Sequence, residues 1–162
     1  MAGLRLTKVT WDNVRAACAL EIRPEQKGTV APVAVSLASA YTVPDIAWPR
    51  LVYDDDQLVG FIMGAFDPDG EIELYRSFLW RLNIGAEHQG KGYGRFAVEG
   101  LYAEALRRGR RRLVTTWSQH EHGPEGFYVR LGFRPTGERH QGEIVAERIL
   151  APGEPGGEYP TE

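Results

Sequence analysis

The sequence predicts an α/β protein, an α+β arrangement in which one mixed β-sheet carries helices on both faces. Strand-like and helix-like periods alternate along residues 1–150 in the order β-α-α-β-β-β-α-β-α-β-β. A glycine-rich turn stands between a strand and the longest helix. The chain of 162 residues, of which 43% are hydrophobic and 25% charged, fits a single globular domain.

The first part of the chain predicts a strand and two helices. A half-buried strand is expected at Leu4–Val9, where apolar and polar residues alternate. Thr10 can cap a helix that continues to about Ile22, and Thr29 can cap a second helix that ends near Tyr41. The packed face of the first helix is expected to comprise Val14, Ala17 and Cys18.

A hairpin and a long strand follow. Leu51–Tyr53 and Leu58–Phe66 flank an acidic turn and predict the hairpin, and Asp67-Pro-Asp-Gly70 is typical of another turn. Glu71–Ile84 is expected to be one extended strand. On strict alternation one face would carry Leu74, Phe78, Trp80, Leu82 and Ile84. The other would carry Tyr75, Ser77, Leu79, Arg81 and Asn83.

The last part predicts two helices and three strands. A helix is expected from about Gly92 to Arg108, stopped by Gly109, and a shorter one spans about 124–131. The expected strands are Arg112–Trp117, Arg134–His140 and Glu143–Leu150.

Composition excludes several classes of protein. The longest nearly apolar stretch, Val30–Tyr41, is too short and interrupted to cross a bilayer. No basic patch followed by an apolar block marks a secretory signal, so we expect a cytoplasmic location with no membrane partner. The single cysteine, Cys18, excludes internal disulfides and multi-cysteine zinc sites. His120-Glu-His122 offers no third ligand at regular spacing, so no metal is expected.

Charge argues against nucleic acid as a partner. The chain carries 19 Lys and Arg against 22 Asp and Glu, and three of the acids lie in the segment 151–162. Residues 1–150 therefore balance at 19 against 19, without the basic surplus of most nucleic-acid-binding domains. The Arg-rich run at 107–112 is expected to be the solvated end of a helix. Residues 151–162, rich in Pro, Gly and Glu, are expected to form a disordered tail.

The sharpest signal is Gln89-Gly-Lys-Gly-Tyr-Gly94 at the start of the long helix. The first N–H groups of a helix lack intrahelical partners and carry the positive end of its dipole, so they can bind phosphate. Lys91 and Arg95 can add positive charge. The alternative is a tight turn that needs glycine for its geometry alone. The spacing fits neither the Rossmann fingerprint nor the Walker loop.

Two motifs resemble the GNAT superfamily of N-acetyltransferases. Gln89, Gly92 and Gly94 are similar to its acetyl-CoA pyrophosphate signature, and Gly126–Phe133 resembles the segment that follows its fifth strand. The resemblance covers nearly all of residues 3–150, so 1–150 is expected to be one GNAT domain. It implies a fold in which the fourth and fifth strands splay apart. Within the superfamily, the chain looks most like the bacterial spermidine/diamine acetyltransferases, which implies a homodimer.

The resemblance implies a site for acetyl-CoA as co-substrate. Leu82, Asn83 and Ile84 would lie beside the pantetheine and the acetyl carbonyl, with a backbone N–H near Ile84 polarising that carbonyl. Tyr128 would be the general acid that protonates the departing thiolate. The pyrophosphate would be held by Gln89, Gly90, Lys91, Gly92, Tyr93, Gly94 and Arg95.

The sequence departs from the family at two positions. Glu121 stands where relatives often carry an Asn that contacts coenzyme A, and Phe78–Trp80 lacks the Glu that often serves as general base. We therefore leave the base unassigned, with Glu71, Glu73 and His120 able to relay a proton through water.

A polyamine needs carboxylates and aromatic faces along its length. Glu21 lies seven residues after Val14 and would continue the packed face of the first helix, where an acid is costly unless it faces a cleft. The alternative is that the helix has frayed by then and Glu21 is solvated. Glu138 and Glu143 flank the closing turn, where exposed acids are common. The expected acceptor-binding residues are Glu21, Tyr41, Tyr75 and Trp117.

The function predicted is acetyl-CoA-dependent N-acetyl transfer to a primary amine of a small, spermidine-like polyamine. The amine would attack directly in a ternary complex. One alternative is another acceptor, such as an aminoglycoside, another amine antibiotic or a protein amine. A second is a non-catalytic domain that binds acyl-CoA as a sensor.

Overall fold

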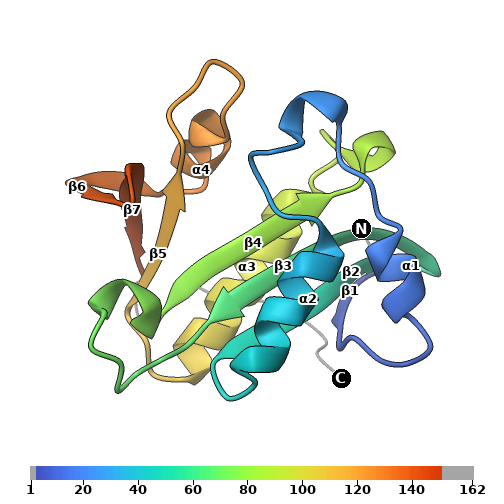
Figure 1. The fold of residues 1–162 in the computed structure, drawn as a ribbon, viewed down its shortest axis with the longest axis horizontal. Coiled ribbons are helices and arrows are strands. Elements are labelled where there is room, and N and C mark those ends of the chain that lie inside the picture. Colours follow the sequence, from blue (N-terminus) through green and yellow to red (C-terminus); the bar gives the residue numbers. More distant parts are fainter. Residues whose placement is uncertain (1–2, 151–162) are drawn as a thin grey trace.

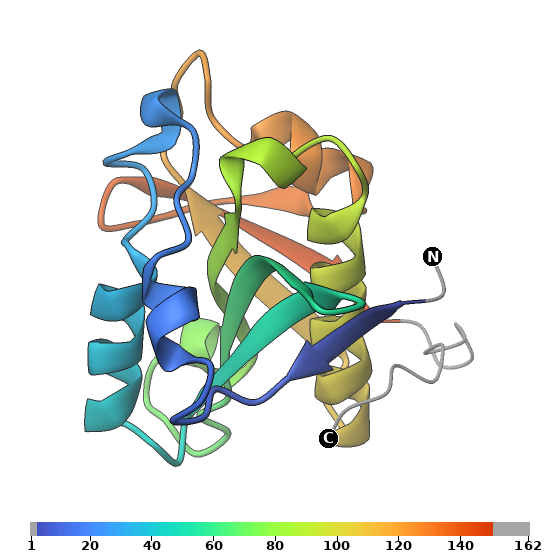
Figure 2. The same ribbon diagram turned by 90° about the vertical axis from the view of Figure 1, so that its right-hand side faces the viewer.

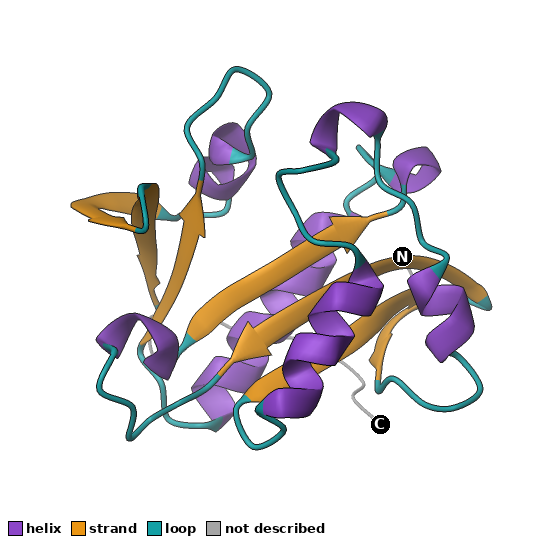
Figure 3. Cartoon of the chain, viewed as in Figure 1, coloured by secondary structure: helices purple, strands orange, loops and turns teal. Residues whose placement is uncertain are grey.

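A computed structural model describes residues 3–150 as one seven-stranded sheet in the order β1-β2-β3-β4-β5-β7-β6 (Figures 1 and 3). The predicted tail, 151–162, lies outside the described residues. The strands are β1 Leu4–Thr7, β2 Ala47–Asp54, β3 Gln57–Ala65, β4 Phe78–Ile84, β5 Arg112–Trp117, β6 Arg134–His140 and β7 Glu143–Ile149. The helices are α1 Val14–Cys18, α2 Val33–Thr42, α3 Tyr93–Arg107 and α4 Glu125–Arg130. Three short 3-10 turns are η1 Pro24–Gln26, η2 Glu73–Arg76 and η3 Ala86–His88. The predicted element order and fold class are confirmed.

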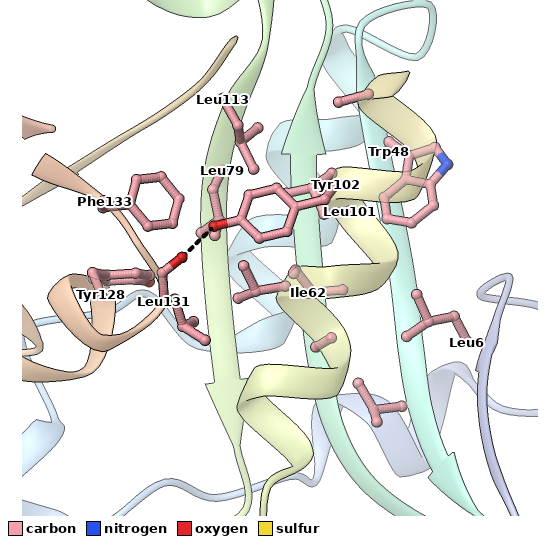
Figure 4. Close-up of a cluster of buried hydrophobic side chains, with 14 of the residues drawn as sticks. Leu6, Trp48, Ile62, Leu79, Leu101, Tyr102, Leu113, Tyr128, Leu131 and Phe133 are labelled. Atoms are coloured by element: carbon pink, nitrogen blue, oxygen red, sulfur yellow. Dashed lines mark hydrogen bonds between the residues drawn. The ribbon is translucent and has the colours of Figure 1, made fainter. Parts of the chain in front are cut away.

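Helices cover both faces of the sheet (Figure 2). We call the face under α1 and α2 the front face and the face under α3 and α4 the back face. The larger core lies at the back, where α3 side chains such as Leu101 pack against the strands and against Phe133 (Figure 4). There the Tyr102 hydroxyl donates to the Leu131 carbonyl at 3.3 Å. The front core is smaller and includes Val33 of α2 and Phe61 of β3.

The predicted splay between β4 and β5 is present. These parallel strands pair only at Phe78 and Val114, where the Val114 N–H donates to the Ser77 carbonyl at 3.0 Å. Beyond that point they diverge (Figure 1). All the other neighbouring strands are antiparallel and pair over several residues. The sheet is thus open at its centre.

The prediction of one strand over Glu71–Ile84 is wrong in two respects. Residues 73–76 form η2 because β3 ends at Ala65, opposite Phe78, and leaves the earlier residues no strand to pair with. The β3–β4 register also shifts between Met63 and Gly64, opposite Trp80. This bulge interrupts the alternation. Leu79 therefore joins Leu82 and Ile84 in the back core, whereas Phe78 and Trp80 pack at the front.

The first two helices are shorter than predicted. α1 covers only Val14–Cys18, and Cys18 is exposed rather than packed. Arg23 precedes a proline and has an extended backbone, so no helix continues through it. α2 begins after Pro32, which lacks an N–H and fits only the start of a helix. Thr29 does not cap it; its hydroxyl donates to the Gln26 carbonyl at 2.6 Å.

Candidate active site

The start of α3 presents a row of free backbone donors. Gly90 and Gly92 have φ values of 76° and 90°, a left-handed conformation that favours glycine. The first helical bond runs from the Phe96 N–H to the Gly92 carbonyl at 3.0 Å. In the described part of the chain, no N–H group from Gly90 to Arg95 donates to another protein group. These donors can bind an anion together.

Two cations stand beside these donors. Lys91 and Arg95 are exposed, and neither has a carboxylate within ion-pair distance among residues 3–150. Their charges therefore add to the positive end of the α3 dipole. The geometry matches the phosphate site that the glycine-rich turn predicts.

Some side chains of this turn support the protein itself. Gln89 Nε2 donates to the Ile84 carbonyl at 3.0 Å and to Gln26 Oε1 at 2.6 Å. Tyr93 is buried, and its hydroxyl donates to Asp54 Oδ2 at 2.6 Å. Gln89 and Tyr93 thus fix the turn, so of the predicted phosphate-binding residues these two can offer a ligand only backbone groups.

Gly94 allows α3 to approach α4. A Cβ atom at Gly94 would lie 3.1 Å from Phe127 Cζ and 3.7 Å from Ile84 Cγ1. The start of α3, the end of β4 and α4 therefore meet at this glycine. A side chain here would push α4 away from the other two.

The C-terminal part of β4, beyond Phe78, exposes the backbone groups of its edge toward β5. Leu82 and Ile84 turn their side chains into the back core, and beyond Phe78 no β4 residue pairs with β5. The Asn83 side chain points toward the connection between α1 and α2 and not toward the predicted pantetheine site. Its side-chain amide donates to the Ala31 carbonyl at 3.0 Å, which fastens the α1–α2 connection to β4, and its Oδ1 is buried without a partner.

Tyr128 lies beside the part of β5 that follows Val114, where β5 no longer pairs with β4. Its ring stacks on Trp117 at 5.7 Å between centroids and 10° between planes. Burial raises the pKa of Tyr128 above its ordinary value, and a hydrogen bond with the Thr115 side chain opposes that shift. The Thr115 hydroxyl donates to the Leu79 carbonyl of β4 at 3.3 Å. A buried phenol that stays protonated at neutral pH can donate a proton into the gap between the strands.

Glu143 on β7 occupies the front side of the same gap. The Thr116 hydroxyl donates to its Oε2 at 2.5 Å, and the Ser118 hydroxyl donates to its Oε1 at 3.2 Å. Burial lowers the pKa of Arg81 on β4, and the charge of Glu143 opposes this shift, so the two groups interact across the gap. Sequence reasoning undervalued Glu143 because the face on which a strand residue lies depends on a register that the sequence did not reveal.

The structure does not gather the four predicted acceptor residues. α1 ends before Glu21, whose carboxylate is exposed and lies 3.8 Å from Lys27 Nζ. Tyr41 is 86% exposed on α2, and a hydrogen bond of 2.9 Å joins the Tyr75 hydroxyl to His140 Nε2. Trp117 alone lies beside the candidate catalytic group. The helical spacing argument for Glu21 fails because the helix ends before that residue is reached.

A cavity of about 360 Å³ opens on the front face. Its lining combines two acidic side chains, one basic side chain and three apolar ones: Glu73, Leu74, Arg112, Val114, Glu138 and Val145. Arg112 bonds to Glu147 and lies 3.3 Å from Glu73. The suggested proton relays Glu71, Glu73 and His120 are all exposed, and of the three Glu73 lines this cavity.

A comparison with family models matches residues 12–133 to the acetyltransferase (GNAT) family. The chain belongs to the GNAT acetyltransferase family. It is therefore an acyltransferase by family, and the match extends from just before α1 to the residue preceding β6. No curated protein matches the sequence.

Solved structures share the GNAT fold at low sequence identity. An acetyltransferase from Thermus thermophilus is 23% identical, with a TM-score of 0.68 over 91% of this chain and 97% of its own. The ribosomal-protein-S18-alanine N-acetyltransferase of Escherichia coli is 16% identical, with a TM-score of 0.67 over 94% and 97%. The PaiA N-acetyltransferase of Thermoplasma acidophilum, solved with coenzyme A, is 14% identical, with a TM-score of 0.66 over 91% and 99%.

Residues 3–150 of this GNAT protein contain neither a candidate membrane span nor a cluster of metal-ligating side chains. No helix there has the length and hydropathy needed to span a bilayer. No three His, Cys, Asp or Glu side chains there come together as a metal site.

The raised pKa of Tyr128 gives a prediction for alkaline stability. The folded state favours the neutral phenol, so its contribution is complete below the unfolded pKa of about 10 and is lost as the pH rises further. Urea unfolding at a series of alkaline pH values on either side of that pKa should show a steeper loss of stability for the wild type than for Tyr128→Phe. Parallel curves for the two proteins would contradict the assignment.

Proposed function

We propose that the protein is an acetyl-CoA-dependent N-acetyltransferase that transfers the acetyl group directly to a primary amine in a ternary complex. The observation that carries the proposal is the unpaired edge of β4. One end of it lies beside the free N–H groups at the start of α3, where Ile84 approaches Gly94, and Leu79 near its other end bonds to Thr115 beside Tyr128. The coenzyme A bound to the Thermoplasma acidophilum relative supports it.

The residues present fit this co-substrate. The N–H groups from Gly90 to Arg95, with Lys91 and Arg95, would hold the pyrophosphate. The unpaired backbone of residues 82–84 would pair with the amides of the pantetheine arm as a neighbouring strand would. A backbone N–H there would polarise the thioester carbonyl. When bound, acetyl-CoA supplies an activated acyl group and a thiolate leaving group.

Tyr128 would protonate that thiolate. A phenol and a thiol have comparable pKa values of about 10 and 8.5, so proton transfer between them is feasible. Because burial raises its pKa, Tyr128 carries its proton throughout the physiological pH range. The stack on Trp117 would hold the ring in place during the transfer.

Glu143 would receive the acceptor. A primary amine with a pKa of about 10.4 is only about 0.04% neutral at pH 7, which costs roughly 4–5 kcal/mol in nucleophile concentration. The Glu143 carboxylate, oriented by Thr116 and Ser118, would bind the ammonium group of the acceptor, accept a proton from it and release that proton to water. Glu143 would thus take the role of the general-base Glu that relatives often carry and that Phe78–Trp80 lacks.

We further propose a spermidine-like polyamine as the acceptor. The cavity on the front face supports this choice, because Glu138 places a carboxylate beside the apolar walls of Val114 and Val145, and the Glu73 carboxylate, which is shared with Arg112, lies in the same lining. Its volume of about 360 Å³ suits a small molecule. Lack of saturable turnover with any polyamine would overturn this acceptor and leave another amine, or acyl-CoA sensing, to be tested. A cytoplasmic location and a homodimer also stay proposals.

The role of Tyr128 is tested by Tyr128→Phe. With spermidine as acceptor, kcat should fall at least about tenfold because the leaving thiolate loses its proton donor, whereas the Kd for coenzyme A should stay within about threefold. Steady-state kinetics and calorimetry measure the two effects. An unchanged kcat would exclude Tyr128 as the acid.

The role of Glu143 is tested by Glu143→Gln. At pH 7 the kcat/KM for spermidine should fall about tenfold to a hundredfold, and the deficit should shrink as the pH approaches about 10, where the free amine is abundant without help. Asp12→Asn, an exposed acid on the chain leading to α1, is the matched control. A pH profile parallel to that of the wild type would contradict the assignment.

A further inference from the structure

A second, smaller cavity lies where β4 and β5 begin. Its volume is about 70 Å³, and its lining comprises Glu73, Arg76, Ser77, Arg110, Arg112 and Val114. We call it the η2 pocket, because Glu73 and Arg76 of η2 form one wall. It lies near the C-terminal end of α3, about 20 Å from the free N–H groups at the other end of that helix. It is therefore separate from the coenzyme site.

The three arginines of the η2 pocket are unequally paired. Arg112 bonds to Glu147 and also lies 3.3 Å from Glu73. Arg76 and Arg110 have no carboxylate within ion-pair distance among residues 3–150. The two carboxylates of the neighbourhood are thus both committed to Arg112, and the pocket keeps a positive surplus.

Polar atoms of the pocket lack partners as well. Ser77 is 3% exposed, and its hydroxyl has no hydrogen-bond partner. Arg110 Nε is buried without one, whereas Arg76 Nε donates to the Gly70 carbonyl at 3.2 Å. Buried donors without acceptors cost free energy. Two half-buried guanidinium groups around one small cavity add repulsion unless an anion lies between them.

We propose that the η2 pocket binds a single oxyanion group, a phosphate or a carboxylate, between Arg76, Arg110 and Ser77. Guanidinium groups bind both oxyanions through paired N–H donors, and the Ser77 hydroxyl supplies a further donor. The pocket has room for one such group and not for a larger ligand. Binding here does not depend on acetyl transfer.

The oxyanion has two sources. The η2 pocket shares Glu73, Arg112 and Val114 with the larger cavity of the front face. It can therefore receive a free anion that acts as an effector. It can also receive an anionic group of a ligand in that cavity, which would have to be an acceptor other than a polyamine because polyamines carry no oxyanion. Both present the same chemistry to Arg76 and Arg110.

The test uses inorganic phosphate and the full chain. Phosphate is titrated at constant ionic strength into protein saturated with coenzyme A, which fills the start of α3, and the arginine Nε–Hε signals are followed by NMR. The Arg76 and Arg110 signals should shift and saturate together. Arg110→Gln should weaken binding at least about tenfold and Ser77→Ala about threefold. Arg111→Gln, the exposed neighbour, should bind as the wild type does.

The outcomes separate this proposal from the acetyltransferase proposal. If coenzyme A fails to bind, the arginine signals still report on the η2 pocket. If phosphate raises the KM for spermidine without lowering kcat, the oxyanion site belongs to the acceptor cavity; a change in kcat with the KM unchanged makes it a separate effector site. Arg76 and Arg110 signals that do not move, or equal affinity in a folded Arg110→Gln protein, would overturn the proposal.

Discussion

The divergence of β4 from β5 is the constraint on which the rest of the site depends. A closed parallel pair would satisfy every backbone group along both strands and leave nothing for a ligand. Here pairing stops after Phe78 and Val114, directly before the bulge at Trp80. The free edge of β4 borders the gap that results, Tyr128 is linked to that edge through Thr115 and Leu79, and Glu143 interacts with Arg81 of β4. The proposed chemistry depends on this incomplete sheet.

Contacts from both faces hold the open edge in place. At the back, Gly94 lets α3 meet Phe127 of α4 and the end of β4. At the front, Asn83 binds the carbonyl of Ala31, and the paired amides of Gln26 and Gln89 connect η1 to the turn before α3. The segment between α1 and α2 is therefore attached to the same residues that border the coenzyme site. We infer that ordering of the glycine-rich turn before α3 and ordering of the segment between α1 and α2 are linked.

Local signals in the sequence were enough for the fold, and they also gave the coenzyme half of the site, which stays a prediction. The order of the elements, the glycine turn and the short helix with Tyr128 each depend on residues close together in the chain. Contacts between distant segments decided what the sequence did not reveal. The bulge at Trp80 depends on the partner register of β3, and it moved Leu79 to the other face. Glu21 was misplaced because α1 stops early, Cys18 lies within α1 but on its exposed side, and the place of Glu143 depends on how β7 pairs with β5.

The most direct test of the account is the amide NMR spectrum of the protein with and without coenzyme A. The largest shifts and the strongest protection from exchange should fall on the backbone N–H groups of residues 90–95 and 82–84. Those of α2 and of the outer strands β1 and β6 should change little. A spectrum that coenzyme A leaves unchanged, or shifts concentrated away from the start of α3 and the open edge of β4, would contradict the account.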